Sequence, residues 1–202
     1  SPLGTAAGYG TPIKIDRKFT LKELGFSSNQ NPIYAQISRG KFEKILLNTL
    51  VQIMFDLNKM SSDLILFSME EFGYFEIPKN FCTGSSIMPQ KNNPDVLEIL
   101  RAKYNCVRSY ENEISNIISN LPSGFHRDFQ LTKNPTIKSI EITLESIKIA
   151  TMLLSEISIN KQKCEEGLTE EIFATQKVYE LVEKGIPFRS AYRIIAKEFK
   201  NK

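Results

Sequence analysis

The sequence predicts an all-α fold, an elongated bundle of long helices followed by a small helical region. The first observation is a series of apolar residues spaced alternately four and three apart between residues 41 and 72. This spacing is typical of an apolar seam along one long helix. Its members are Leu46, Leu50, Ile53, Leu57, Met60, Leu64 and Phe67. The second observation is that similar seams recur in residues 94–120 and after Pro135, so that long helices can pack together.

The N-terminal 38 residues are the least regular part of the sequence. They are rich in Gly, Pro, Ser and Asn and show no sustained period, so we expect irregular structure with a short helix near Leu21–Leu24. The helix over residues 41–72 would be roughly 48 Å long at 1.5 Å per residue. A helix of that length needs partners that cover its apolar seam.

The second long helix is expected to begin at Pro94 and to end near Asn120, before Pro122 and Gly124. One polar residue, Lys103, interrupts its seam. The other members are Val96, Leu100, Val107, Tyr110, Ile114, Ile117 and Leu121.

A third helix is expected after Pro135, and shorter elements follow it. Its apolar stripe contains Ile140, Leu144, Ile147, Thr151 and Leu154. Further along, Thr169 is expected to cap a Glu-rich helix that Gly185 closes. Pro187 then opens a last helix, which ends near Phe199.

Composition argues against several classes of function. The formal net charge of the 202 residues is only +3, without a long Lys/Arg cluster, so no nucleic-acid partner is expected. No stretch of about 18 apolar residues occurs, so no membrane span is expected. Cys82, Cys106 and Cys164 lie far apart, which favours reduced thiols in a cytoplasmic protein. His126 is the only histidine, so one chain cannot build a multi-histidine site, and neither metal nor cofactor is expected.

Residues 83–94, Thr-Gly-Ser-Ser-Ile-Met-Pro-Gln-Lys-Asn-Asn-Pro, form the most informative stretch. The Gly-Ser-Ser opening is flexible and exposes backbone N–H groups to an anion, and Lys91 adds a positive charge. Asn93 followed by Pro94 is typical of a helix N-cap with proline at the first helical position. A mobile loop that leads into a helix N-terminus can bind a carboxylate and stabilise charge that develops on it.

This loop resembles the signature of the fumarase/aspartase superfamily, whose members cleave C–N or C–O bonds and release fumarate. Within the superfamily, residues 88–91 (Met-Pro-Gln-Lys) and 93–95 (Asn-Pro-Asp) are most similar to the argininosuccinate lyases. The resemblance implies β-elimination of argininosuccinate to arginine and fumarate, as in arginine biosynthesis. Further similar stretches occur in the same order along the chain: Gly8 to Arg17, Thr83 to Arg101, Arg127 to Gln130 with Lys133, and Gly185 to Tyr192.

The resemblance also implies roles for individual residues. Ser85 matches the general base, and a serine hydroxyl can act as a base only where its oxyanion is stabilised, for example by backbone amides and Lys91. Glu98 matches the glutamate that orients a catalytic histidine. The positions that match substrate-binding residues are Ser86, Lys91, Asn93, Gln130 and Lys133.

Each of these residues also has a plainer interpretation. Ser85 can be a loop serine that stabilises a turn, Asn93 can serve only as a helix cap, and Glu98 can be a solvent-facing helix residue. The heptad seams alone would favour an ordinary helical scaffold.

The sequence departs from the family pattern at several positions. Phe125 stands where the family usually has tyrosine, which removes one hydroxyl contact. Asn92 replaces a common lysine. Arg39 is one position out of register with a family arginine, so it is not placed in the site. The histidine that would pair with Glu98 belongs to an N-terminal motif that this sequence lacks.

The resemblance covers only part of the family's usual length, so the chain is expected to be a fragment. Residues 1–160 would be a partial central helical-bundle domain and residues 161–202 a truncated small helical C-terminal domain. Because the family builds each active site from three subunits of a homotetramer, we expect the chain to self-associate and to be inactive alone. We also expect residues 82–93 to be mobile without ligand.

Two other functions stay open. One is a non-enzymatic helical assembly or structural protein, as in relatives that serve as lens proteins. The intact set of Ser85, Lys91, Asn93 and Glu98 argues against it. The other is a sibling lyase, such as adenylosuccinate lyase or fumarase, which Gln90 and the motif in residues 127–133 disfavour.

Overall fold

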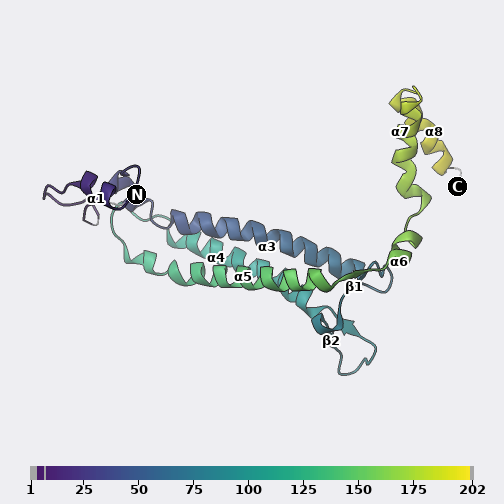
Figure 1. The fold of residues 1–202 in the computed structure, drawn as a ribbon, viewed down its shortest axis with the longest axis horizontal. Helices are drawn as coiled ribbons and strands as arrows, with labels where there is room; N and C mark the ends of the chain where they lie inside the picture. The colour runs from purple at the N-terminus through teal and green to yellow at the C-terminus, as the bar shows by residue number, and fades with distance from the viewer. Residues whose placement is uncertain (1–3, 7, 201–202) are drawn as a thin grey trace. The chain divides into compact units, whose positions relative to one another are not determined.

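In the computed structural model, residues 4–6 and 8–200 are described, and they are mostly helical (Figure 1). Two pairs of two-residue antiparallel strands are the only sheet structure among them. The all-α prediction is confirmed. The helices are α1 (Arg17–Glu23), α2 (Pro32–Ile37), α3 (Lys41–Phe67), α4 (Asp95–Ile117), α5 (Lys133–Glu156), α6 (Lys161–Glu166), α7 (Ala174–Glu183) and α8 (Phe188–Lys200), with 3-10 turns η1 (Lys79–Phe81), η2 (Arg127–Gln130) and η3 (Glu170–Phe173). The strands are β1 (Phe75–Glu76), β2 (Thr83–Gly84), β3 (Asn92–Asn93) and β4 (Ser158–Ile159).

The chain divides into two compact units. The strand pair β1–β4 lies within the second unit, together with α6, α7 and α8, and the signature loop lies in the first. The assignment of residues 1–160 and 161–202 to two family domains stays a prediction. The first unit comprises Ser1–Ile65 and Pro78–Glu156, and the second Leu66–Ile77 and Ile157–Lys202.

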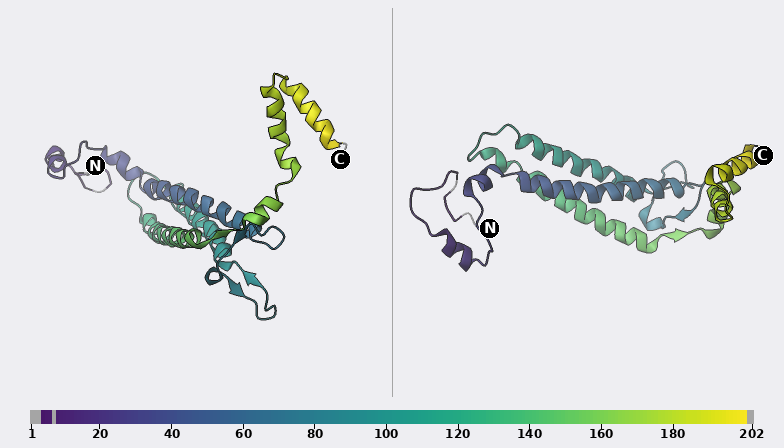
Figure 2. Two further views of the ribbon diagram at one scale, coloured as in Figure 1. Left: turned by 45° about the vertical axis from the view of Figure 1, so that its right-hand side comes forward. Right: turned by 90° about the horizontal axis from the view of Figure 1, so that it is seen from above.

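The first unit is a bundle in which α3, α4 and α5 run side by side (Figure 2). Its core centres on Val51 and Met54 of α3 and Val107 of α4, which are almost completely buried. Ile142 of α5 packs against this cluster. Burial of such side chains away from water is the main force that holds the three helices together.

The face that α5 buries consists mainly of small residues, which lets α4 and α5 approach closely. The hydroxyls of Ser139, Thr143 and Ser146 each donate to the carbonyl four residues earlier, at 2.7 Å. These hydroxyls are therefore satisfied within their own helix and need no partner on α4. Burial of these hydroxyls therefore costs little free energy.

The predicted seam is correct for α4 and partly correct for α3, where the predicted Leu64 is buried and the predicted Leu50 and Leu57 pack against the core cluster. Leu100, Val107 and Ile114 of α4 are buried as predicted. On α3 the buried seam contains Leu47, Val51 and Met54, one position after the predicted one, and the predicted Leu46 and Ile53 are 40% and 36% exposed. Apolar residues occupy both positions of the heptad, so the sequence pattern alone could not rank the two faces.

The predicted stripe of α5 is also the wrong face. Leu144, Ile147 and Leu154 are 54%, 38% and 49% exposed. The reason is steric, because close packing on α4 selects the small side chains of the opposite stripe. The two large apolar faces of α3 and α5 therefore remain uncovered within this chain.

The ends of the long helices differ slightly from prediction. Helix α3 ends at Phe67 rather than at 72, because Phe67 begins a ring cluster with Phe72 and Tyr74 around a turn at Gly73, where φ is +60°. Helix α4 ends at Ile117, and α5 begins two residues before Pro135. Proline is tolerated there because the first helical N–H groups have no intrahelical partner.

The first 38 residues contain more helix than predicted. The expected short helix is α1, which starts earlier, at Arg17, after the Asp16 cap. Helix α2 was not predicted, although Asn31 followed by Pro32 is a capping signal, and the Asn31 side chain accepts from Ile33 N at 3.0 Å.

In the second unit, α7 and α8 pack around Val178, Ala191 and Ile195. Gly185 follows α7 with φ of +88°, as expected for a glycine that closes a helix. Thr169 is the N-cap residue of η3, as predicted by position, but its side chain makes no cap bond.

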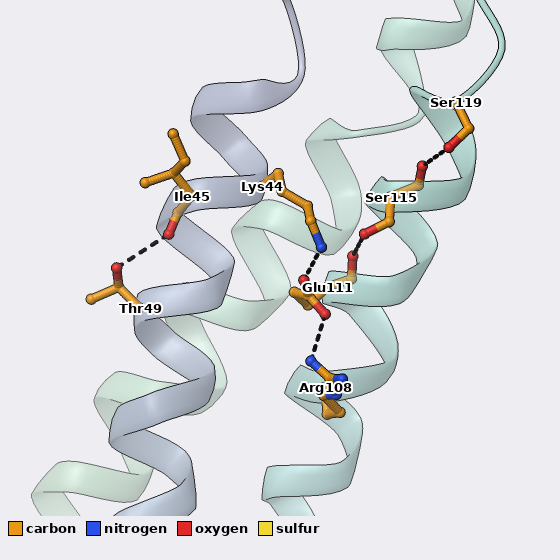
Figure 3. Close-up of polar contacts among 7 residues, drawn as sticks. All are labelled: Lys44, Ile45, Thr49, Arg108, Glu111, Ser115 and Ser119. Carbon is orange, nitrogen blue, oxygen red and sulfur yellow. Dashed lines mark hydrogen bonds and ion pairs between the residues drawn. The ribbon is translucent and has the colours of Figure 1, made fainter.

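A buried carboxylate ties α4 to α3 (Figure 3). Glu111 of α4 is 2% exposed, and its Oε1 bonds Lys44 Nζ of α3. Arg108 Nη1 donates to Glu111 Oε2 at 2.9 Å. A buried charge is tolerated only where partners of opposite charge satisfy it, so this pair fixes one register of α3 on α4.

Removing Lys44 should destabilise the bundle because Glu111 would keep only one cationic partner. We expect Lys44→Met to lower the free energy of unfolding by about 2–3 kcal/mol. The double variant Lys44→Met/Glu111→Leu should recover most of that loss. Urea unfolding at one fixed protein concentration measures both effects.

The matched control is Lys103→Met. Lys103 Nζ lies 3.2 Å from Glu145 Oε2, and the Glu145 side chain is 67% exposed. A surface pair of this kind contributes about 0–1 kcal/mol. Equal losses for the two lysine variants, or a double variant no better than Lys44→Met, would contradict the role given to Glu111.

The exposed faces of α3 and α5 lead us to expect self-association of the 202-residue chain. Ile53→Glu combined with Leu144→Glu should lower the mass measured by light scattering, because each places a charge on an apolar face. The control is Asn112→Glu on an exposed polar position of α4. A monomeric mass for the unmodified chain at high concentration would refute this expectation.

Candidate active site

The signature loop is a short hairpin that ends where α4 begins. Strands β2 and β3 pair antiparallel, with Thr83 opposite Asn93 and Gly84 opposite Asn92. Residues 85–91 therefore form the loop between them. Pro94, not Asn93, is the N-cap residue of α4, and no side chain caps this helix. The prediction that Asn93 caps α4 is wrong, which leaves its amide available for a ligand.

Ser85 is half-buried at the start of this loop, and its hydroxyl faces two backbone donors. Its Oγ accepts from Met88 N at 3.1 Å and from Ile87 N at 3.3 Å. This is the turn-forming serine of the plainer interpretation. It is also the arrangement that a serine base needs, because two N–H donors stabilise an oxyanion more than a neutral hydroxyl.

The other predicted residues of this end lie around the hairpin and the first turn of α4. Ser86, Lys91 and Glu98 are exposed, and Asn93 is half-buried. The Lys91 N–H closes a turn on Met88 O at 3.1 Å. In the part of the chain that the structure describes, no carboxylate pairs with the Lys91 ammonium group. Its charge is therefore available to an anionic ligand near the positive end of the α4 dipole.

Cys82 lies beside the hairpin, but its environment disfavours the reactive thiolate. Burial raises the pKa of the Cys82 thiol, and the nearby carboxylate of Asp95 raises it further. Because the thiolate is the nucleophilic form, a raised pKa leaves Cys82 less reactive than an ordinary cysteine.

The start of α5 and strand β2 lie at opposite ends of the bundle, and Ser85 directly follows β2 (Figure 1). Gln130 ends η2 and Lys133 begins α5, and both are exposed. Helix α4 has 23 residues and would span roughly 34 Å between the two ends. One copy of the chain therefore does not bring the predicted site residues together. His126 is also at this far end, where its Nε2 lies 2.7 Å from Pro122 O.

Arg39 also lies at the second end of the bundle, although it is not one of the predicted site residues. Its guanidinium carbon lies 4.7 Å from the ring centre of Phe129 and 5.3 Å from that of Phe125. Because Arg39 is shifted by one position from the family arginine, the motif alone did not identify it. Its contacts with aromatic rings 86 and 90 positions later could not be read from spacing.

Neither a metal site nor a membrane helix is found where the structure describes the chain. Residues 4–6 and 8–200 contain no group of three or more His, Cys, Asp or Glu side chains arranged to hold a metal ion. No helix in the same residues combines the length and apolar character needed to cross a membrane.

Comparison with known proteins agrees with the sequence motifs. The sequence profile of the family described as Lyase matches residues 1–108. An argininosuccinate lyase of Thermotoga neapolitana is 53% identical over 98% of this chain and 50% of its own length. An argininosuccinate lyase of Sorangium cellulosum is 41% identical over 98% of the chain and 46% of its own length. The chain thus spans about half the length of the curated relatives it matches.

Solved structures show the same fold at lower identity. The class II fumarase of Schistosoma mansoni has a TM-score of 0.75 at 19% identity, covering 98% of this chain and 46% of that one. A fumarate lyase:delta crystallin from Brucella melitensis, bound to cobalt, has a TM-score of 0.72 at 19% identity, covering 98% and 45%. These solved structures share the fold of this chain, and the profile match over more than half of the sequence shows that the chain belongs to the family described as Lyase.

Proposed function

We propose that this chain is part of an argininosuccinate lyase, which cleaves argininosuccinate to arginine and fumarate. The observation that carries the proposal is the Ser85 hydroxyl, held by two backbone N–H donors in the signature hairpin. The identity of 53% with an argininosuccinate lyase supports the choice of substrate. We place the enzyme in the cytoplasm, because free cysteines such as Cys106 fit a reducing compartment.

Ser85 is proposed as the general base. Its oxyanion removes the proton from the carbon next to the one that carries the departing nitrogen. The electron pair first delocalises into the adjacent carboxylate and then forms the double bond of fumarate as the C–N bond breaks. The N–H groups of Ile87 and Met88 stabilise the Ser85 oxyanion before this step.

The groups around the hairpin are proposed to hold the carboxylate that gains charge. Lys91 supplies a positive charge, Asn93 a side-chain amide, Ser86 a hydroxyl, and the α4 N-terminus its unpaired N–H groups. Each of these interactions strengthens as negative charge builds up on the carboxylate. They therefore stabilise the transition state more than the bound substrate.

Gln130 and Lys133 are proposed to bind substrate in a different copy's site. The distance of roughly 34 Å along α4 is too long for one small substrate to contact both ends of one bundle. A homotetramer in which different copies supply different ends, as the family resemblance implies, meets this requirement. The uncovered apolar faces of α3 and α5 offer surfaces for such an assembly.

A proton must also reach the departing nitrogen, and this chain has no histidine near Ser85. Its only histidine, His126, directly precedes η2. Glu98, exposed on α4, is proposed to orient a histidine supplied by a segment outside this sequence. We therefore propose that the 202-residue chain is inactive alone.

Complementation tests the role of Ser85. The chain is mixed with a full-length argininosuccinate lyase relative inactivated at the serine of its own signature loop, and fumarate release is measured. We expect the mixture to gain activity because Ser85 restores a base to shared sites. Ser85→Ala in the chain should lower this activity by about 10²–10⁴-fold.

The matched control is Ser119→Ala, which removes a hydroxyl that donates only to Ser115 O, at 2.6 Å near the far end of α4. This variant should complement like the unmodified chain. Enzyme-like fumarate release by the chain alone would contradict the proposed inactivity. Equal complementation by Ser85→Ala would contradict the proposed base.

A further inference from the structure

Helix α8 presents a row of positive charges to the solvent. Arg189, Arg193, Lys197 and Lys200 follow one another at spacings of four, four and three residues, so they share one face of the helix, and all of them are exposed. Within residues 4–6 and 8–200, none of them forms an ion pair with a carboxylate. Like charges in a row repel one another, and an anionic partner would relieve that repulsion. We call these residues the basic row.

An apolar pocket of about 380 Å³ lies beside the basic row, where α7 and α8 pack together (Figure 1). Its lining includes Val178 of α7 and Phe188, Tyr192, Ile195 and Phe199 of α8. Ala196 also lines the pocket, three residues after Arg193 and four before Lys200, so the basic row runs along the edge of the pocket. Phe188 and Tyr192 are 52% and 57% exposed. Exposed aromatic rings beside arginine are typical of protein–protein interfaces.

The same unit carries a surface of complementary character. Residues 165–173, Glu-Glu-Gly-Leu-Thr-Glu-Glu-Ile-Phe, have exposed glutamates and three exposed apolar side chains. These are Leu168, Ile172 and Phe173, at 54%, 58% and 39% exposure. Glu171 of this acidic segment also lines the pocket, so the acidic segment and the pocket adjoin within one copy. A two-fold axis between adjoining complementary surfaces brings each of them onto its complement in a second copy.

We propose that a second copy of this chain binds here, with the acidic segment of each copy on the basic row of the other. The Ile172 side chain of one copy enters the apolar pocket of the other. Glu165 has no ion pair among the described residues of its own copy, so its carboxylate is available to the basic row. An apolar anchor flanked by charge pairs supplies both affinity and register. This contact does not depend on the proposed function, and it lies in the second unit rather than on the exposed faces of α3 and α5.

Carbodiimide cross-linking tests the contact, because it joins a carboxylate to a lysine amine only where the two groups touch. An equal mixture of isotope-labelled and unlabelled 202-residue chains is cross-linked, and mass spectrometry identifies linked peptides that carry one label each. We expect links between Glu165 or Glu166 of one copy and Lys197 or Lys200 of the other. Self-association through α3 and α5 alone would not produce them. Absence of these links, or links only within one copy, would overturn the proposal.

An exchange of charges provides a sharper test. Arg193→Glu/Lys197→Glu and Glu165→Lys/Glu166→Lys should each lower the yield of links between copies by about tenfold, because attractive pairs become repulsive. An equal mixture of the two variants should restore the links, because opposite charges then meet again across the contact. If the mixture links no better than either variant alone, the proposed pairing is wrong.

Matched controls separate this contact from general attraction between charged chains. Lys148→Glu/Lys184→Glu reverses two exposed cations outside the basic row and should link like the unmodified chain. Ile172→Gln keeps every charge but removes the apolar anchor, so it should lower the yield about fivefold. Ile159→Gln changes an apolar side chain of similar exposure, 60%, and should have no effect. Equal losses in the test variants and in their controls would contradict a specific contact.

Discussion

The contact between Glu111 and its two cationic partners sets the geometry on which the rest of the bundle depends. Helices α3 and α4 are rich in apolar residues, and apolar contacts alone tolerate sliding by one heptad position. A buried carboxylate does not, because moving it away from Lys44 or Arg108 would leave charge unpaired in the core. Once α4 is fixed on α3, the small residues of α5 pack against α4. The hairpin at one end and the η2 turn at the other then have defined positions on one scaffold.

This scaffold explains why the candidate site residues form two separate groups in one chain. The hairpin end carries a serine prepared by backbone donors, a lysine and a helix N-terminus. The η2 end carries Gln130, Lys133 and a stacked arginine. Helix α4 keeps the two ends apart, which is why we propose that a complete site takes more than one copy. The proposed assembly would also cover exposed apolar surfaces such as that around Leu144.

The sequence predicted the helices well and their facing surfaces less well. Heptad spacing located α3, α4 and α5, because periodic apolar residues are a local signal. It chose the wrong face of α5, because packing there selects small hydroxyl residues such as Thr143 rather than Leu144. It placed Ser85 in the loop before α4, but Asn93 belongs to a strand pair that no capping rule anticipates. Arg39 is absent from the predicted site because it is one position out of register with the family arginine, and its aromatic partners are distant in sequence.

We propose that the hairpin holds the Ser85 oxygen as a base directed at bound substrate. A crystal structure of the chain, assembled with its inactivated full-length relative and soaked with argininosuccinate, tests this most directly. We expect Ser85 Oγ to keep its hydrogen bonds to the amides of Ile87 and Met88. We also expect it to lie close enough to the reacting carbon to take its proton. Substrate bound with its reacting carbon away from Ser85, or with Ser85 turned away from those amides, would contradict it.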